Sequence, residues 1–141
     1  MFVLLYYSIN TIGGGANMEW QIDNNKPVYI QLVEQLKMKI ISGEIELDSK
    51  LDSVRNLASD AMVNPNTMQK ALAELERQGF VYSKRTSGRF VTDDKDLIDT
   101  ERKKLVKENV KKSLETLINL GYTDEEIISL VKEILTEGTD E

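Results

Sequence analysis

The polar side chains between residues 64 and 91 are the part of this sequence whose types and spacing suggest chemistry. Four residues share one face of a helix by their spacing: Asn66, Gln69, Lys70 and Ala73. Asn and Gln present a hydrogen-bond donor and an acceptor side by side, which matches adenine, and the first N–H groups of such a helix can bind phosphate. Residues 64–91 also hold five basic side chains against two acidic ones. The pattern favours DNA binding over the plainer interpretation, a solvated helix face.

The composition excludes several kinds of catalytic and metal site. The 141 residues include no cysteine and no histidine, which removes disulfides, zinc fingers, thiol nucleophiles and imidazole bases. Paired carboxylates such as Glu125 and Glu126 are better explained by a helix capping box, since adjacent helical residues point in different directions. We therefore expect a protein that is not an enzyme and that needs no metal and no cofactor.

The overall charge does not indicate a nucleic-acid binder. The net charge is −6 and the sequence pI is near 4.8. Residues 18–93 carry 10 basic and 11 acidic side chains, whereas residues 94–141 carry 8 and 13, so the acidic excess lies in the second part. No stretch approaches the 18 apolar residues of a membrane span, and we expect a cytoplasmic protein with no membrane partner.

Three helices are predicted before residue 80. The first runs from Pro27 to a stop at Gly43, and a loop over residues 44–52 follows. Ser53 caps a short second helix. Asn64 and Pro65 are a preferred cap and first residue for the third. Their apolar faces predict the core: Tyr29, Val33, Leu36, Ile40, Val54, Leu57, Ala58, Ala61, Met68, Ala71, Leu72 and Leu75.

A β-hairpin is predicted after the third helix. Residues 80–83 and 89–92 are strand-like, and residues 84–88 form a turn with a glycine at its end. Three helices followed by a hairpin, with a short connection between the second and third helices, is the order of a winged helix-turn-helix. We therefore expect a mainly α fold with a small β-hairpin wing and a C-terminal helical dimerisation segment.

Residues 27–92 resemble the DNA-binding domain of the GntR family of bacterial transcription regulators. The matching motifs follow one another in the family's order and spacing: residues 27–32, 41–45, 51–58, 63–67, 71–80 and 87–91. The short helical C-terminal part looks like the YtrA-type subfamily, whose members carry a small two-helix dimerisation segment. The resemblance implies a dimeric regulator, more often a repressor, that binds a palindromic operator in double-stranded DNA and responds in some members to a small-molecule effector.

The resemblance also places the residues that contact DNA. Arg55 stands where the second helix contacts phosphate or a base, and four residues begin the recognition helix: Asn64, Asn66, Thr67 and Gln69. Lys70 shares their face. The wing that enters the minor groove matches Arg85, Thr86, Ser87 and Gly88. For Arg77 and Lys84 a structural role is the better interpretation, since Arg77 lies near the far end of its helix and can pair with Glu74.

Three residues depart from the family pattern. Asp48 and Asp52 stand where a glycine and a proline are usual, and they bring negative charge near the DNA. We expect Asp52 to repel phosphates and to hold Arg55 away from them; the alternative is that Asp52 caps the second helix. Met62 stands where glycine is frequent. A positive φ there would cost about 1 kcal/mol or somewhat more.

The C-terminal residues 94–141 predict two helices. One runs from Leu97 to Leu120 and ends at Gly121, and a capping box at residues 123–126 begins the other. Their apolar residues are too many for one hairpin to bury, which favours a homodimer over packing on the chain's own winged helix. The expected dimerisation residues are Ile98, Leu105, Val110, Leu114, Leu117, Ile128, Val131 and Leu135.

The expected organisation has three parts. Residues 1–17 are interpreted as an upstream extension before Met18, with a genuine N-terminal strand as the alternative. Residues 18–93 form the winged helix-turn-helix domain, and residues 94–141 form the dimerisation segment. A winged-helix protein-interaction module without DNA readout is the second hypothesis, which the basic wing and the polar face of the third helix argue against.

Overall fold

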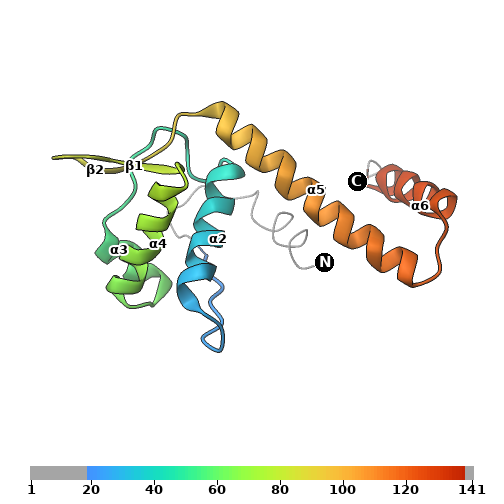
Figure 1. Ribbon diagram of the computed structural model, residues 1–141, viewed down its shortest axis with the longest axis horizontal. Coiled ribbons are helices and arrows are strands. Elements are labelled where there is room, and N and C mark those ends of the chain that lie inside the picture. Colours follow the sequence, from blue (N-terminus) through green and yellow to red (C-terminus); the bar gives the residue numbers. More distant parts are fainter. Residues whose placement is uncertain (1–18, 139–141) are drawn as a thin grey trace. The chain divides into compact units, whose positions relative to one another are not determined.

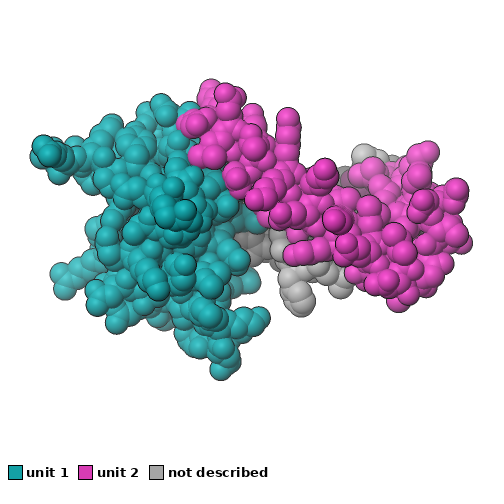
Figure 2. Space-filling model, viewed as in Figure 1, with its two compact units in different colours: residues 1–93 teal, residues 94–141 magenta. Residues whose placement is uncertain are grey.

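The computed structural model describes residues 19–138, arranged in two compact units that divide between Asp93 and Asp94 (Figures 1 and 2). Residues 1–17, interpreted above as an extension, lie outside the described residues. Within residues 19–138 the element order is three helices, two strands and two further helices. A mainly helical chain with one small hairpin confirms the predicted fold class.

The described part of the first unit, residues 19–93, contains three helices whose ends follow the predicted signals. Helix α2 spans Val28–Ile41, α3 spans Val54–Ala61 and α4 spans Pro65–Arg77. The Ser53 hydroxyl accepts from the Asn56 N–H at 3.1 Å and begins α3. The Asn64 side chain begins α4 in the same way, with proline at the first helical position. Both α2 and α3 pack against α4 (Figure 1).

The wing is a two-stranded antiparallel hairpin, β1 (Val81–Lys84) and β2 (Gly88–Val91). Val81 pairs with Val91 and Ser83 with Arg89. The segment 48–51, predicted to be part of a loop, hydrogen-bonds along the other edge of β2. The Leu51 N–H donates to the Arg89 carbonyl and the Val91 N–H donates to the Ser49 carbonyl, both at 2.9 Å. The wing is therefore fixed to the chain segment that leads into α3.

The core of the first unit lies between the three helices and the base of the wing. Most predicted core residues are buried, but Tyr29 and Val54 are half-buried, since both stand in the first turn of a helix. Lys39 is also buried, and its Nζ lies 3.0 Å from Glu44 Oε1. The largest of the fully buried side chains are Leu32, Leu36, Lys39, Ile40, Leu57, Met68, Leu72, Leu75, Phe80, Val81 and Val91.

Among the residues that the structure describes, two that are not glycine adopt the left-handed backbone region. Met62 (φ 53°) ends α3, and Asp48 (φ 60°) lies in the segment that pairs with β2. These are two of the positions where the sequence departs from the family pattern, and the backbone there has the conformation that favours glycine. The positive φ considered for Met62 is confirmed, and the Met62 side chain is 91% exposed. The energy cost of this conformation stays a prediction. Aspartate tolerates this region better than most residues.

The second unit consists of α5 (Lys95–Asn119) and α6 (Asp124–Glu137). The predicted capping box is present, because the Thr123 N–H donates to Glu126 Oε2 at 2.9 Å and Thr123 Oγ1 accepts from the Glu126 N–H at 3.3 Å. No helix among residues 19–138 is long and apolar enough to cross a membrane. The same residues hold no cluster of three or more acidic side chains suited to a metal ion.

Candidate nucleic-acid interface

The first two turns of α4 present a polar surface to solvent. The predicted residues Asn66, Gln69 and Lys70 are exposed, as is Ala73, while Thr67 is half-buried. Buried residues on the opposite side of α4 attach this helix to α2 and α3. The arrangement holds the short polar side chains on a rigid support, as base reading requires.

The backbone of the first turn of α4 is already hydrogen-bonded. Asn64 Oδ1 accepts from the Asn66 N–H at 2.8 Å, and the Asn64 carbonyl accepts from the N–H groups of Thr67 and Met68 at 3.0 and 3.1 Å. The expectation of free N–H groups is therefore wrong for this turn, because its own cap uses them. Phosphate binding at this helix start stays a prediction. Asn64 itself is exposed, with its side-chain oxygen engaged in the cap.

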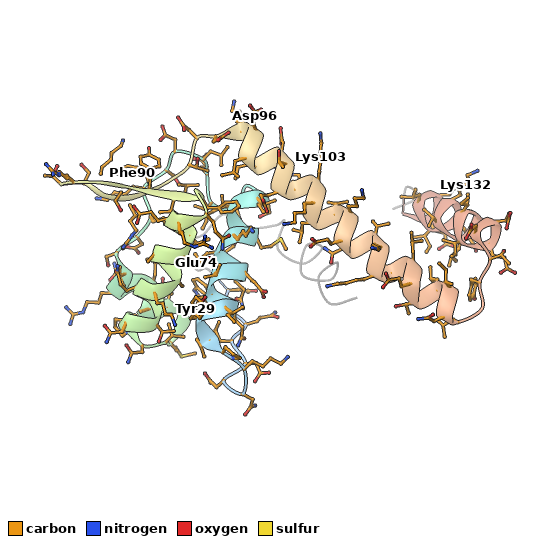
Figure 3. The ribbon with its side chains drawn as sticks, in the orientation of Figure 1. Tyr29, Glu74, Phe90, Asp96, Lys103 and Lys132 are labelled. Carbon is orange, nitrogen blue, oxygen red and sulfur yellow. The ribbon has the colours of Figure 1, made fainter. Side chains whose placement is uncertain are left out.

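Lys70 leaves the polar face of α4 toward α2. Its Nζ lies 4.4 Å from the centroid of the Tyr29 ring, a cation–π contact between the two helices. Tyr29 and Glu74 mark α2 and α4 in Figure 3. The lysine remains exposed. It therefore places a positive charge at the α2 side of the polar surface and not next to the amides of Asn66 and Gln69.

The tip of the wing is exposed and basic. Arg85, Thr86, Ser87 and Gly88 are all exposed. The Lys84 ammonium lies 4.2 Å from the centroid of the Phe90 ring, which is labelled on the wing in Figure 3. Lys84 therefore packs along the hairpin, as the structural interpretation of this residue predicted. Gly88 has a φ of 105°, and a Cβ there would approach Lys50 Cε to 3.3 Å, so the turn needs glycine.

Arg55 and Asp52 stand at the start of α3, and both are exposed. Asp52 Oδ1 accepts from the Ser53 N–H at 2.8 Å and from the Asn56 side-chain amide at 2.9 Å. The carboxylate is therefore directed to the cap of α3 rather than to Arg55, and the expectation that it holds Arg55 away is wrong. The alternative, a capping role, is the one that these contacts support.

Asp48 connects the segment before α3 to the wing. The Tyr82 hydroxyl donates to Asp48 Oδ1 at 2.6 Å, and this hydrogen bond to a nearby carboxylate raises the pKa of Tyr82 to about 12. The Tyr82 ring stacks on Phe90, with 5.8 Å between the centroids. Asp48 therefore stabilises the base of the wing.

Arg77 lies at the far end of α4 and pairs with Glu74, as predicted. Its Nε and one terminal nitrogen donate to the two Glu74 carboxylate oxygens at 2.8 and 2.6 Å. These hydrogen bonds, with another from Gln78, lower the pKa of Glu74 to about 2. Glu74 and Gln78 are half-buried and Arg77 is exposed. The cluster lies on the side of α4 that faces Lys37 of α2, whose Nζ lies 3.4 Å from Gln78 Oε1.

Arg89 is a residue of the interface that the sequence reasoning did not assign. It lies on β2, and one of its terminal nitrogens donates to Gln69 Oε1 on α4 at 3.3 Å. Its Nε lies 4.0 Å from Glu76 Oε2. The only sequence signal was an arginine in a short strand next to the wing tip, and the contact depends on tertiary packing.

Comparisons with known proteins agree with this geometry. Residues 28–91 match the model of bacterial regulatory proteins of the gntR family. The HTH-type transcriptional regulator YhcF of Bacillus subtilis is 34% identical over 121 residues, which cover 86% of this chain and 99% of YhcF. The HTH-type transcriptional repressor YtrA of the same organism is 33% identical over 117 residues, covering 81% of this chain and 90% of YtrA.

A solved structure extends the likeness to the second unit. A GntR family transcriptional regulator from Listeria monocytogenes superimposes with a TM-score of 0.72 at 37% identity, over 79% of this chain and 98% of that one. The likeness therefore covers nearly the whole of a regulator of similar length. The chain belongs to the GntR family of bacterial regulatory proteins and is a DNA-binding transcription regulator with a winged helix.

Proposed function

We propose that this regulator binds a palindromic operator as a homodimer, with the start of α4 in the major groove and the wing in the minor groove. The observation that carries the proposal is the exposed polar surface of α4, where Asn66 and Gln69 stand on a helix whose other side is buried. Arg85 to Gly88 at the exposed wing tip and Arg55 at the start of α3 supply the neighbouring contacts. Residues 18–93 are the DNA-binding domain in this proposal.

Residues 94–141 form the dimerisation segment in this proposal. The proposed contact residues Val110, Ile128, Val131 and Leu135 are 45–67% exposed, and Leu105, Leu114 and Leu117 are half-buried. Ile98 is only 2% exposed within one chain and is left out of the interface. Further apolar side chains that extend the exposed surface are Val106, Ile118 and Ile134. An apolar surface of this extent on two helices supports association with a second copy.

Repression is the proposed outcome of binding, because the relative YtrA carries the name of a repressor. A dimer that covers an operator blocks the DNA to other proteins. A small-molecule effector, if one acts, would bind between two subunits, since two helices are too few to enclose a pocket of ordinary size. The proposed site of action is the cytoplasm, where bacterial DNA lies.

Selection from a random DNA library tests the proposal. Full-length protein is incubated with random duplexes, bound DNA is amplified and sequenced, and light scattering of the protein gives its mass. We expect an inverted repeat with half-sites one helical turn or so apart, and a mass of two chains. Enrichment of a single half-site by a monomer would contradict the dimer. Enrichment of no sequence would contradict base reading and favour a protein-interaction module.

A further inference from the structure

Arg89 brings the wing and the recognition helix α4 into direct contact. Its side chain is 21% exposed and extends from β2 along α4, between Gln69 and Glu76, which are seven residues apart and therefore on one side of the helix. The Arg89 backbone is fixed as well, because its carbonyl accepts from the Leu51 N–H and its strand neighbour is Ser83. A strand held on both edges presents the guanidinium to α4 from a fixed position.

The chemistry of the guanidinium decides which way the Gln69 amide turns. A guanidinium has hydrogen-bond donors only, so the atom of Gln69 that faces it is the oxygen, at 3.3 Å. The Gln69 side chain is otherwise exposed. With its oxygen directed to Arg89, the outward part of the amide is the NH2 group, which carries two donors.

An amide can offer a base edge both its oxygen and its nitrogen, or its nitrogen alone, and these two cases fit different bases in the major groove. A glutamine that pairs with adenine uses its oxygen and its nitrogen together, accepting from N6 and donating to N7. A glutamine that offers only donors fits best the edges that present acceptors, which are N7 and O6 of guanine or O4 of thymine. At adenine it can donate to N7 but leaves the N6 donor without an acceptor. The orientation of Gln69 therefore affects which base it prefers.

We propose that Arg89 is a positioning residue that makes Gln69 a donor-only reader, so that the base pair under Gln69 is read as guanine or thymine rather than adenine. This inference rests on the proposed function, in which Gln69 faces the major groove. Glu76 assists from the other end, because its carboxylate lies 4.0 Å from the Arg89 Nε, which is buried without a hydrogen-bond partner. That contact is too long for a hydrogen bond and acts by charge alone.

Binding to a set of four operators tests the inference. The operators differ only at the base pair where Gln69→Ala abolishes discrimination, and affinities are measured by fluorescence anisotropy. We expect the wild-type protein to favour guanine or thymine there. Arg89→Met keeps an unbranched apolar side chain and removes the guanidinium donors, so it should shift the preference toward adenine by about tenfold. Arg77→Met removes the same charge from the far end of α4 and should leave the preference unchanged.

A second variant and a spectroscopic measurement keep the test independent of folding defects. Glu76→Gln leaves Arg89 in place but removes its charge partner, and should shift the preference in the same direction by less. Nitrogen-15 NMR of the DNA-free protein should show the Gln69 side-chain amide resonance move in Arg89→Met and stay in Arg77→Met. An unmoved resonance would overturn the proposed contact.

The remaining outcomes separate this inference from the proposed function. If Gln69→Ala changes discrimination at no base pair, Gln69 does not read bases. The proposed DNA contact of Gln69 and the inference drawn from it are then both wrong. If Gln69→Ala abolishes discrimination but Arg89→Met leaves the preference as in wild type, Gln69 reads alone and the positioning role is overturned. If Arg89→Met abolishes discrimination at a different base pair, Arg89 reads DNA itself and the inference is again wrong.

Discussion

The two units of this regulator differ in what they bury. Within residues 19–93 the helices and the wing enclose a core of fully buried side chains, and the exposed surface of α4 is polar. Within residues 94–138 only Ile98 and Ile127 are buried among the apolar side chains, and Val131, Ile134 and Leu135 are 45–67% exposed. The first unit thus buries most of its apolar residues, with Ile30 and Met62 as exposed exceptions, and offers hydrogen-bonding groups. The second unit offers apolar surface. We infer that the first binds DNA and the second binds another copy.

The largest expected effect comes from placing charge on the apolar surface of α6. Val131→Glu would bury a carboxylate in the proposed dimer interface, so we expect a monomer and a loss of about 100-fold or more in affinity for an inverted repeat, because the linked second half-site is lost. Analytical ultracentrifugation gives the mass, and titration of the selected operator gives the affinity.

Ser129→Glu is the matched control for this change. Ser129 is exposed and lies on the opposite side of α6 from Val131, so the same charge there should leave both mass and affinity unchanged. A Val131→Glu protein that remains a dimer would place the interface outside this surface and would weaken the contrast between the units.

The next effect tests the polar surface of α4. Asn66→Ala should cost about 1–3 kcal/mol on the best operator and almost nothing on random DNA, because a base-reading amide contributes only where its base is present. Arg85→Ala at the wing tip should weaken both, and should lower the slope of log affinity against log salt by about one if it neutralises one phosphate. Equal losses on both DNAs for Asn66→Ala would mean that this side chain does not read bases.

The sequence predicted the elements of the first unit well because their signals are local. Asn64, Pro65 and Ser53 determine where helices begin through hydrogen bonds within three residues, and the capping box at Thr123 acts over the same distance. Both strands have the predicted length, but each is shifted by one residue toward the turn. Pairing partners rather than local preference decide where a strand begins and ends.

Contacts between distant residues were the ones that the sequence did not predict. The pairing of residues 48–51 with β2, the Arg89 contact with Gln69 and the turning of Lys70 toward Tyr29 all join residues well apart in the chain. The pattern identified which residues face outward on α4, but only tertiary packing determines what holds them. The residues that contact DNA remain predictions, and the experiments above test them.

A smaller effect concerns the charge at the start of α3. Asp52→Asn keeps an oxygen that can accept from the Ser53 N–H and removes the negative charge, so we expect unchanged thermal stability and about threefold tighter DNA binding at low salt, of the order of 0.5–1 kcal/mol. Screening should shrink this gain as salt rises. Operator titrations at two salt concentrations, with melting curves, measure both.

Asp52→Pro introduces the residue that is usual at this position in the family pattern. The substitution removes both hydrogen bonds of the Asp52 carboxylate, so we expect a lower melting temperature, from a loss of about 1 kcal/mol. A higher melting temperature would show that the stiffer chain outweighs the lost cap. Affinity that fails to rise in Asp52→Asn would show that the charge is too far from the DNA to matter.

The smallest effect is a titration that reports on the base of the wing. The pKa of Tyr82 is raised to about 12 because its hydroxyl donates to Asp48, so this tyrosine should ionise later than one in water, near 10. A raised pKa means that the folded state holds the proton more tightly than the unfolded state. The stabilisation is therefore complete below pH 10 and is lost as pH rises from 10 to about 12.

Phenolate absorbance measured against pH resolves this step. The chain has five tyrosines, and Tyr82→Phe should remove the latest of the ionisations. Asp48→Asn keeps an oxygen acceptor at a left-handed position that asparagine also tolerates, so the backbone should hold while the pKa of Tyr82 falls toward 10. An unchanged titration in Asp48→Asn would show that burial rather than the carboxylate raises the pKa.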